Sequence, residues 1–181
     1  MSRPRLLDLF CGAGGAAVGY HRAGFDVTGV DINPQPRYPF EFHQADAIHY
    51  LAEHWQEFDA VHASPPCQSY STGVSSKSSK WVPTLGKDEP ALIGAVHERL
   101  VHLELPWVIE NVMGARKHMP GLWFVLCGAM FDRPIPRHRV FSTSFGVQPL
   151  EHPNCRGLAK RSAEELGWEY RDMSVGDKGD Q

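Results

Sequence analysis

The chain has 181 residues, of which 42% are hydrophobic, and its formal net charge is −3. This length and hydrophobic content suit a single α/β domain with a sizeable buried core. The slightly acidic balance excludes a positive field over the whole molecule, so any nucleic acid has to be bound by a local basic strip.

Apolar runs alternate with helical patterns along the chain. Leu6–Phe10 is predicted to be a buried strand, which is followed by a glycine turn and a small-residue helix at about 16–22. Further strands are expected at 25–30, 40–43, 58–63, 107–112 and 140–143, and helices starting near 46 and 90. This alternation predicts a Rossmann-like α/β fold, with a mostly parallel sheet and helices on both faces.

Two segments show no periodicity. Residues 68–88 are rich in Ser, Thr, Gly and Lys, and a loop of this length inside a domain is usually a functional lid or disordered. Beyond about Gln148 the sequence turns polar, and the tail 175–181 is expected to fray. We therefore expect a catalytic domain at 1–147 and a short polar segment at 148–181.

The glycine turn allows two interpretations. Gly12–Ala17 matches G-x-G-x-x-A after a strand, and Asp31 follows at the next strand end, which is also the fingerprint of NAD-type oxidoreductases. Asp8, just before the turn, would repel a pyrophosphate but can face the cationic amino-acid end of S-adenosylmethionine. Asp31 would then bind the ribose hydroxyls and Asp46 the adenine amine, although Asp46 also suits a helix N-cap.

Cys67 is the candidate nucleophile. It follows a buried strand within Ser64–Gln68, at the edge where open α/β sheets place their chemistry, and two prolines fix its turn. The alternative is a buried, inert cysteine. Cys11 and Cys127 are interpreted as packing residues.

The cysteines form no C-x-x-C pair, which fits free thiols in a reducing cytoplasm. Cys155 and His152 could begin a metal site, but two further ligands are not evident, so no metal is expected. No stretch approaches the roughly 20 apolar residues of a membrane span. A soluble, cytoplasmic protein is the expectation.

Acidic and basic side chains are expected near the same sheet edge. Glu110, next to Asn111, ends an apolar strand, where partial burial would raise its pKa and let it protonate a ring nitrogen. The alternative is a carboxylate facing water. Arg137 and Arg139 lie on one face of the strand they enter, which suits a phosphate or a pyrimidine carbonyl, or else a solvated basic turn.

Taken together, these motifs resemble the cytosine-5 DNA methyltransferases over residues 5–145. The resemblance is carried by Asp8–Gly15, Ser64–Gln68, Glu110–Val112 and Arg137–Arg139, in that order. It implies a methyltransferase fold, with S-adenosylmethionine as cofactor and cytosine-containing DNA as partner and substrate. The cofactor-binding residues it implies are Asp8, Phe10, Gly12, Gly14, Asp31, Asp46 and Pro65.

The resemblance also implies a mechanism. The Cys67 thiolate would add to carbon 6 of cytosine, Glu110 would protonate N3, and carbon 5 would take the methyl group. Arg137 and Arg139 would hold the base and the nucleophile loop. A target base in duplex DNA has to be flipped out of the stack first.

The sequence departs from the family at two places. Ile135 stands where the arginine motif usually has Gln, so one contact to the base or phosphate is expected to be absent. No long target-recognition region and no Gly-Asn segment follow Thr143; the basic residues there are Arg156, Lys160, Arg161 and Arg171. Three interpretations remain open: a compact DNA methyltransferase, an enzyme for single-stranded DNA or a free cytosine nucleotide, and a cofactor-binding piece that needs a partner chain.

Overall fold

A computed structural model describes residues 2–70, 91–133, 135–148, 150–155 and 157–158. Seven strands form one sheet: β1 (Arg5–Leu9), β2 (Asp26–Asp31), β3 (Glu41–Gln44), β4 (Ala60–Ala63), β5 (Trp107–Val112), β6 (Trp123–Cys127) and β7 (His138–Thr143). The α-helices are α1 (Gly15–Arg22), α2 (Ala47–His54) and α3 (Ile93–Leu100). Short 3-10 helices are η1 (Trp55–Glu57), η2 (Gln68–Tyr70), η4 (Met113–His118) and η5 (Gly128–Phe131).

The sheet order is β3-β2-β1-β4-β5-β7-β6. Strands β1 to β5 pair in parallel, whereas β7 runs antiparallel to both of its neighbours, β5 and β6. The order reverses between β1 and β4, so the chain leaves these neighbouring strands in opposite directions across the sheet. Such a switch point is where open α/β sheets bind their ligands.

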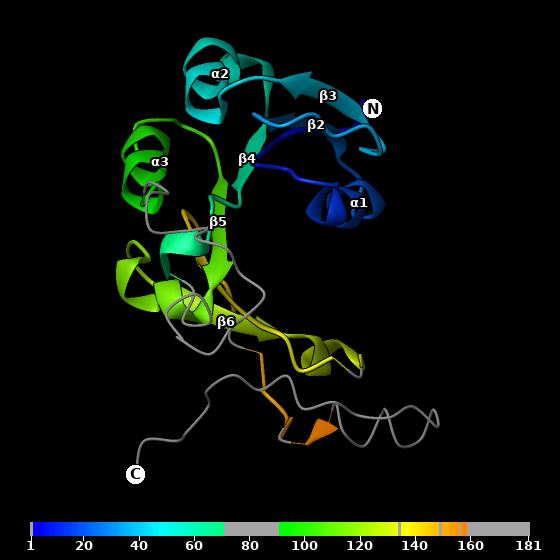
Figure 1. The fold of residues 1–181 in the computed structure, drawn as a ribbon, viewed down its shortest axis with the longest axis vertical. Coiled ribbons are helices and arrows are strands. Elements are labelled where there is room, and N and C mark those ends of the chain that lie inside the picture. Colours follow the sequence, from blue (N-terminus) through cyan, green and yellow to red (C-terminus); the bar gives the residue numbers. More distant parts are fainter. Residues whose placement is uncertain (1, 71–90, 134, 149, 156, 159–181) are drawn as a thin grey trace, which may run out of the picture.

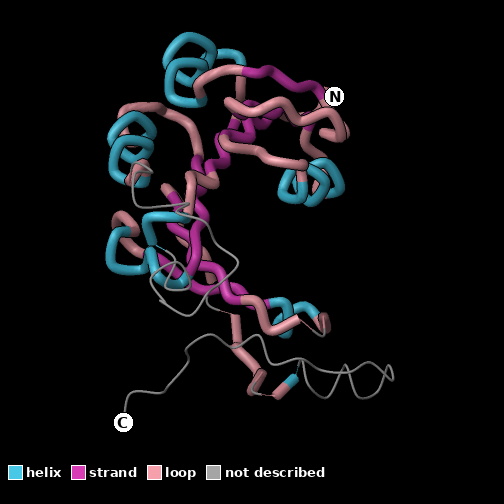
Figure 2. The backbone as a smooth tube through the Cα atoms, in the orientation of Figure 1, coloured by secondary structure: helices cyan, strands magenta, loops and turns pink. Residues whose placement is uncertain are grey.

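Helices cover both faces of the sheet, as predicted (Figures 1 and 2). On one face, the main core joins α2 and α3 to the inward side chains of β1, β4 and β5, with Leu7, Leu51, Val61, Leu100 and Ile109 among its most buried members. On the other face α1 packs through Ala17 over Leu6 and Val27. Because strand side chains alternate, Asp8, His62 and Glu110 lie on the α1 face.

Most predicted elements are confirmed, with shifts of a few residues at their ends. The edge strand β6 was not predicted; its last residue, Cys127, is buried as expected, whereas its first, Trp123, is 41% exposed. The antiparallel direction of β7 was also not predicted. Residues 71–88 of the expected loop, and the expected fraying at 175–181, lie outside the described residues.

None of the described helices is both long enough and apolar enough to cross a membrane.

Candidate active site

A cavity of about 330 Å³ opens at the carboxyl edge of the parallel strands. Six predicted site residues line it: Phe10, Asp31, Pro65, Cys67, Glu110 and Arg139. A second cavity, of about 380 Å³, shares Phe10, Ser64, Glu110 and Arg139 with the first and adds Asp8 and Arg137. The fold therefore brings the predicted nucleophile, acid and arginines together with two of the predicted cofactor carboxylates.

The glycine turn between β1 and α1 has a conformation that requires glycine. Gly12 has φ +49° and Gly14 has φ +85°, both in the left-handed region. A Cβ atom at Gly14 would lie 2.7 Å from Cδ of Pro39 and 3.0 Å from Cδ2 of Tyr38. The turn thus passes close to the segment after β2. Neither Gly12 nor Gly14 lines either of the two cavities, so their contact with a cofactor stays a prediction.

Asp31 joins this turn to the end of β2. Its Oδ2 accepts a hydrogen bond from the Gly12 N–H at 3.0 Å, and its Oδ1 accepts one from the Asn33 N–H at 2.9 Å. Each carboxylate oxygen has a second lone pair, which remains available for a hydroxyl donor in the cavity. The geometry is compatible with the ribose-binding role that the resemblance implies.

Asp8 is the most perturbed carboxyl group of the site. It is 1% exposed, and Tyr38 Oη donates a hydrogen bond to its Oδ2 at 3.3 Å. Burial raises the pKa of Asp8 to about 7, an effect that the Tyr38 bond opposes and the charge of Asp31 reinforces. Its Oδ1 is buried without a hydrogen-bond partner among the described residues. A buried carboxylate oxygen left unpaired beside a cavity is a place for a cationic ligand group.

Asp46 lines neither cavity. It is the N-cap of α2, where its Oδ1 accepts a hydrogen bond from the His49 N–H at 2.8 Å. The capping role that the sequence left open is therefore the one the structure shows, while contact with an adenine stays a prediction.

Cys67 is held by the strand that precedes it and by a neighbouring strand. The Asn111 side-chain N–H, on β5, donates a hydrogen bond to the Pro65 carbonyl at 2.9 Å. The Tyr70 N–H then donates to the Cys67 carbonyl at 3.0 Å, closing the short helix η2. Asn111 is only 2% exposed, so this anchor is shielded from water. The result is a half-buried thiol at a fixed position in the wall of the first cavity.

Glu110 forms an ion pair across the β5–β7 interface. Its Oε1 lies 2.8 Å from Nε of Arg139. Burial raises the pKa of Glu110, although Arg139, the Ser64 hydroxyl and Arg137 each act to lower it. Glu110 therefore keeps its proton to a higher pH than an exposed glutamate. That property suits an acid that must donate to a weakly basic ring nitrogen.

A hydrogen-bonded chain behind Glu110 was missed by sequence reasoning. Tyr20 Oη lies 3.0 Å from His62 Nδ1, and His62 Nε2 lies 2.8 Å from Ser64 Oγ. Ser64 in turn hydrogen-bonds the Glu110 carboxyl group. Burial lowers the pKa of His62 to about 4, so its ring is neutral at physiological pH. The available signal was a histidine at an alternate position of an otherwise apolar strand, two residues before Ser64.

Comparison with solved structures identifies the fold. The chain superposes on a mutant of DNMT2 from Spodoptera frugiperda with a TM-score of 0.56 and 19% identity, over 83% of this chain and 53% of that one. The methyltransferase EhMeth of Entamoeba histolytica superposes with a TM-score of 0.54 and 16% identity, over 84% of this chain and 58% of that one. Dnmt2 of S. pombe superposes with a TM-score of 0.51 and 20% identity, over 81% of this chain and 53% of that one. The fold is that of these methyltransferases, and the chain spans little more than half the length of these relatives.

Sequence comparison is more specific for the N-terminal part. Residues 4–81, which hold the glycine turn, Asp31 and Cys67, match the family of C-5 cytosine-specific DNA methylases. A stretch of 35 residues is 57% identical to the type II methyltransferase M.XorII of Xanthomonas oryzae, covering 19% of this chain and 8% of that protein. The resemblance to cytosine-5 DNA methyltransferases is thereby confirmed in the segment that carries Cys67.

Proposed function

We propose that the protein transfers a methyl group from S-adenosylmethionine to carbon 5 of cytosine in DNA, with Cys67 as the nucleophile. The observation that carries this proposal is that the Cys67 thiol and the Glu110 carboxyl group line one cavity. A thiol and an acid that line the same cavity can act on two atoms of one planar ring.

Each catalytic residue has a separate role in the proposed reaction. Cys67 forms a bond to carbon 6, and Glu110 gives its proton to N3, so that the electron pair moves to carbon 5. Carbon 5 then takes the methyl group, with S-adenosylhomocysteine as the leaving group. Transfer of the carbon 5 proton to water restores the ring double bond and releases Cys67 as a thiolate. Arg139 holds Glu110 in place through their 2.8 Å ion pair, and the exposed Arg137 is available to a phosphate or carbonyl oxygen.

The cofactor fits the neighbouring carboxylates. S-adenosylmethionine, when bound, supplies an electrophilic methyl group. The unpaired Oδ1 of Asp8 would bind its ammonium group, Asp31 would bind the ribose hydroxyls, and the turn at Gly12 and Gly14 would pass beside it. Phe10 and Pro65 line the first cavity with apolar side chains. An NAD-type oxidoreductase is not favoured, because Asp8 would face a pyrophosphate and because the family match is to methylases.

The decisive variant is Cys67→Ser, which should abolish methyl transfer and leave binding of S-adenosylhomocysteine nearly unchanged. DNA containing 5-fluorocytosine, incubated with S-adenosylmethionine, should give a denaturant-stable adduct to wild type but not to Cys67→Ser. The control is Cys11→Ser. Burial raises the pKa of the Cys11 thiol to about 12, so it is not ionised and the adduct should persist. Activity in Cys67→Ser would overturn the mechanism.

The substrate form is tested separately. Transfer of labelled methyl groups to duplex DNA, single-stranded DNA and dCMP should be measured side by side. We expect duplex DNA to be methylated, with the base flipped out of the stack into the cavity. If only dCMP or only single-stranded DNA is labelled, that smaller molecule is the substrate and the proposal of duplex DNA is wrong. Activity that appears only after a second chain is added would show that target recognition comes from a partner.

A further inference from the structure

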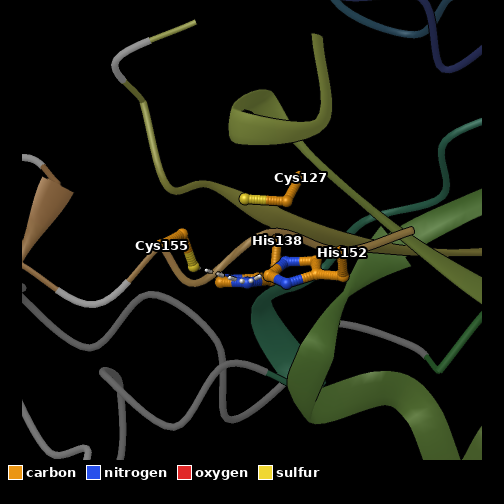
Figure 3. Close-up of side chains that lie close together, drawn as sticks. All are labelled: Cys127, His138, His152 and Cys155. Carbon is orange, nitrogen blue, oxygen red and sulfur yellow. Dashed lines mark hydrogen bonds between the residues drawn. The ribbon is translucent and has the colours of Figure 1, made fainter. Parts of the chain in front are cut away.

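Four side chains of the types that bind metal ions meet where β6 ends and β7 begins, and none of the four lines either of the two cavities. Figure 3 shows Cys127, His138, His152 and Cys155 gathered around one point. One ligand atom from each lies within 4.8 Å of the ligand atoms of the other three. From sequence alone, Cys155 and His152 lacked further ligands. The structure brings two further side chains of ligand type, Cys127 and His138, next to them.

The fold explains how residues so far apart in the sequence meet. Cys127 ends β6 and His138 begins β7, and the two are direct partners in the antiparallel register. The chain then leaves β7 and returns, so that His152 and Cys155, three residues apart, lie against this pair. Sheet pairing thus fixes two ligands, and a short His-x-x-Cys segment supplies the others.

Two of the separations are close to those of a tetrahedral zinc site. The Nε2 atoms of His138 and His152 are 3.0 Å apart, and Cys155 Sγ lies 3.5 Å from His138 Nε2. The thiols of Cys127 and Cys155 are in hydrogen-bond contact. Zinc bonds of about 2.3 Å to sulfur and 2.0–2.1 Å to nitrogen put two nitrogens about 3.3 Å apart and a nitrogen and a sulfur about 3.6 Å apart.

We propose that this cluster binds one Zn²⁺ ion as a structural Cys2His2 site. Two thiolates and two imidazoles complete a tetrahedron, so no position remains open for water or substrate. The absence of an oxygen ligand among the four argues against magnesium and calcium. Each thiol loses its proton on binding, so two protons are released per ion.

The ion would secure the strand that carries the arginines. The His138 side chain lies on the face of β7 opposite to those of Arg137 and Arg139, because side chains alternate along a strand. The His138 carbonyl also accepts a hydrogen bond from Arg139 Nη1 at 2.9 Å. Binding at His138 therefore ties residues 152–155 to the sheet edge and fixes the backbone from which Arg139 reaches Glu110.

The test is the metal content of the full chain, purified without chelator and measured by elemental mass spectrometry. We expect one zinc per chain in wild type and loss of most of it in Cys127→Ser, Cys155→Ser and His152→Asn. Cys67→Ser and Cys11→Ser are matched thiol controls that should keep their zinc. Circular dichroism separates loss of metal from loss of fold, and His152, being exposed, can be replaced without leaving a buried cavity.

Cobalt gives a second readout. The apoprotein titrated with Co²⁺ should develop the visible bands of tetrahedral cobalt and a thiolate charge-transfer band, saturating at one equivalent. A folded wild-type protein that holds no zinc and gives no such spectrum would overturn the proposal, as would a Cys127–Cys155 disulfide in reductant-free protein. These measurements do not depend on methyl transfer, so they test the zinc site independently of the result of the activity assay.

Discussion

Asp8 on β1 and His62 on β4 lie opposite each other in the parallel register, and burial shifts their pKa values in opposite directions. The pKa of Asp8 rises from 3.8 to about 7, and that of His62 falls from 6.5 to about 4. Both groups are therefore largely neutral in the folded protein over the interval between pH 4 and 6.5, a state in which burial costs least.

This pair predicts two opposed contributions to the pH dependence of stability. Folded Asp8 binds a proton that the unfolded chain has lost, so its contribution falls as pH rises from about 4 to about 7. Unfolded His62 binds a proton that the folded chain lacks, so its contribution rises between about pH 4 and 6.5. In wild type the two changes offset each other over the shared interval.

Single variants should separate the two contributions. The free energy of unfolding of Asp8→Asn should rise by a few kcal/mol from pH 4 to 6.5, relative to wild type, because only the His62 contribution remains. In His62→Gln it should fall relative to wild type between about pH 4 and 6.5, because the His62 contribution is lost and only the Asp8 contribution remains. Urea denaturation at stepped pH measures both, and variant curves that run parallel to wild type would contradict the assignment.

Cofactor affinity should depend on pH through Asp8. Because a cationic ammonium group needs the ionised carboxylate, binding below pH 7 has to displace the Asp8 proton. As the pH rises towards 7, the dissociation constant of S-adenosylhomocysteine should fall about tenfold per pH unit, and above pH 7 it should level off. Calorimetry should show weaker binding without this slope in Asp8→Asn. Asp46→Asn, altered at a helix cap, should keep the slope, and a flat wild-type profile would exclude the Asp8 contact.

The Arg139–Glu110 ion pair predicts a shift in the pH–rate profile. Arg139→Gln removes a cation that lowers the pKa of Glu110, so the alkaline limb of methyl transfer should move to higher pH. The rate constant should fall about tenfold to a hundredfold, because a charge-assisted hydrogen bond that orients the acid is lost. Arg137→Gln is the matched control and should move the limb less, since Arg137 acts more weakly on Glu110. Glu110→Gln should remove the limb, and an unshifted limb in Arg139→Gln would contradict the pairing.

The glycine turn predicts opposite effects for two neighbouring alanine substitutions. Gly14→Ala forces a side chain into a left-handed conformation, which costs about 1–2 kcal/mol, and places its Cβ 2.7 Å from Pro39. Gly19→Ala lies inside α1 with nothing within 4 Å of the added atom, and should stabilise by up to about 1 kcal/mol. Thermal and urea unfolding of both variants provide the measurement. Equal stability of the two would contradict this account of the turn.

Much of the site could be predicted because its residues follow strands. Asp31, Cys67 and Glu110 each end a parallel strand or follow it closely, and the carboxyl ends of parallel strands meet at one edge. The short motifs around them carry enough local information to give both the strand and the chemistry. Sequence alone therefore determined the α/β class, and it predicted Cys67 as nucleophile, Glu110 as its acid and the sheet edge proposed for the cofactor.

Other features depend on pairings between segments distant in the chain. Strand β6 lies at the sheet edge and β7 inserts antiparallel beside β5, and neither position leaves a periodic signal in the local sequence. The pairing of Cys127 with His138, on which the proposed zinc site depends, exists only through this insertion. The partial neutrality of Asp8 and the neutrality of His62 likewise come from burial, because desolvation depends on what packs around a group and not on its neighbours in the sequence. The sequence determined which chemical groups reach the sheet edge, and the tertiary structure decided their protonation, their partners and the second cluster.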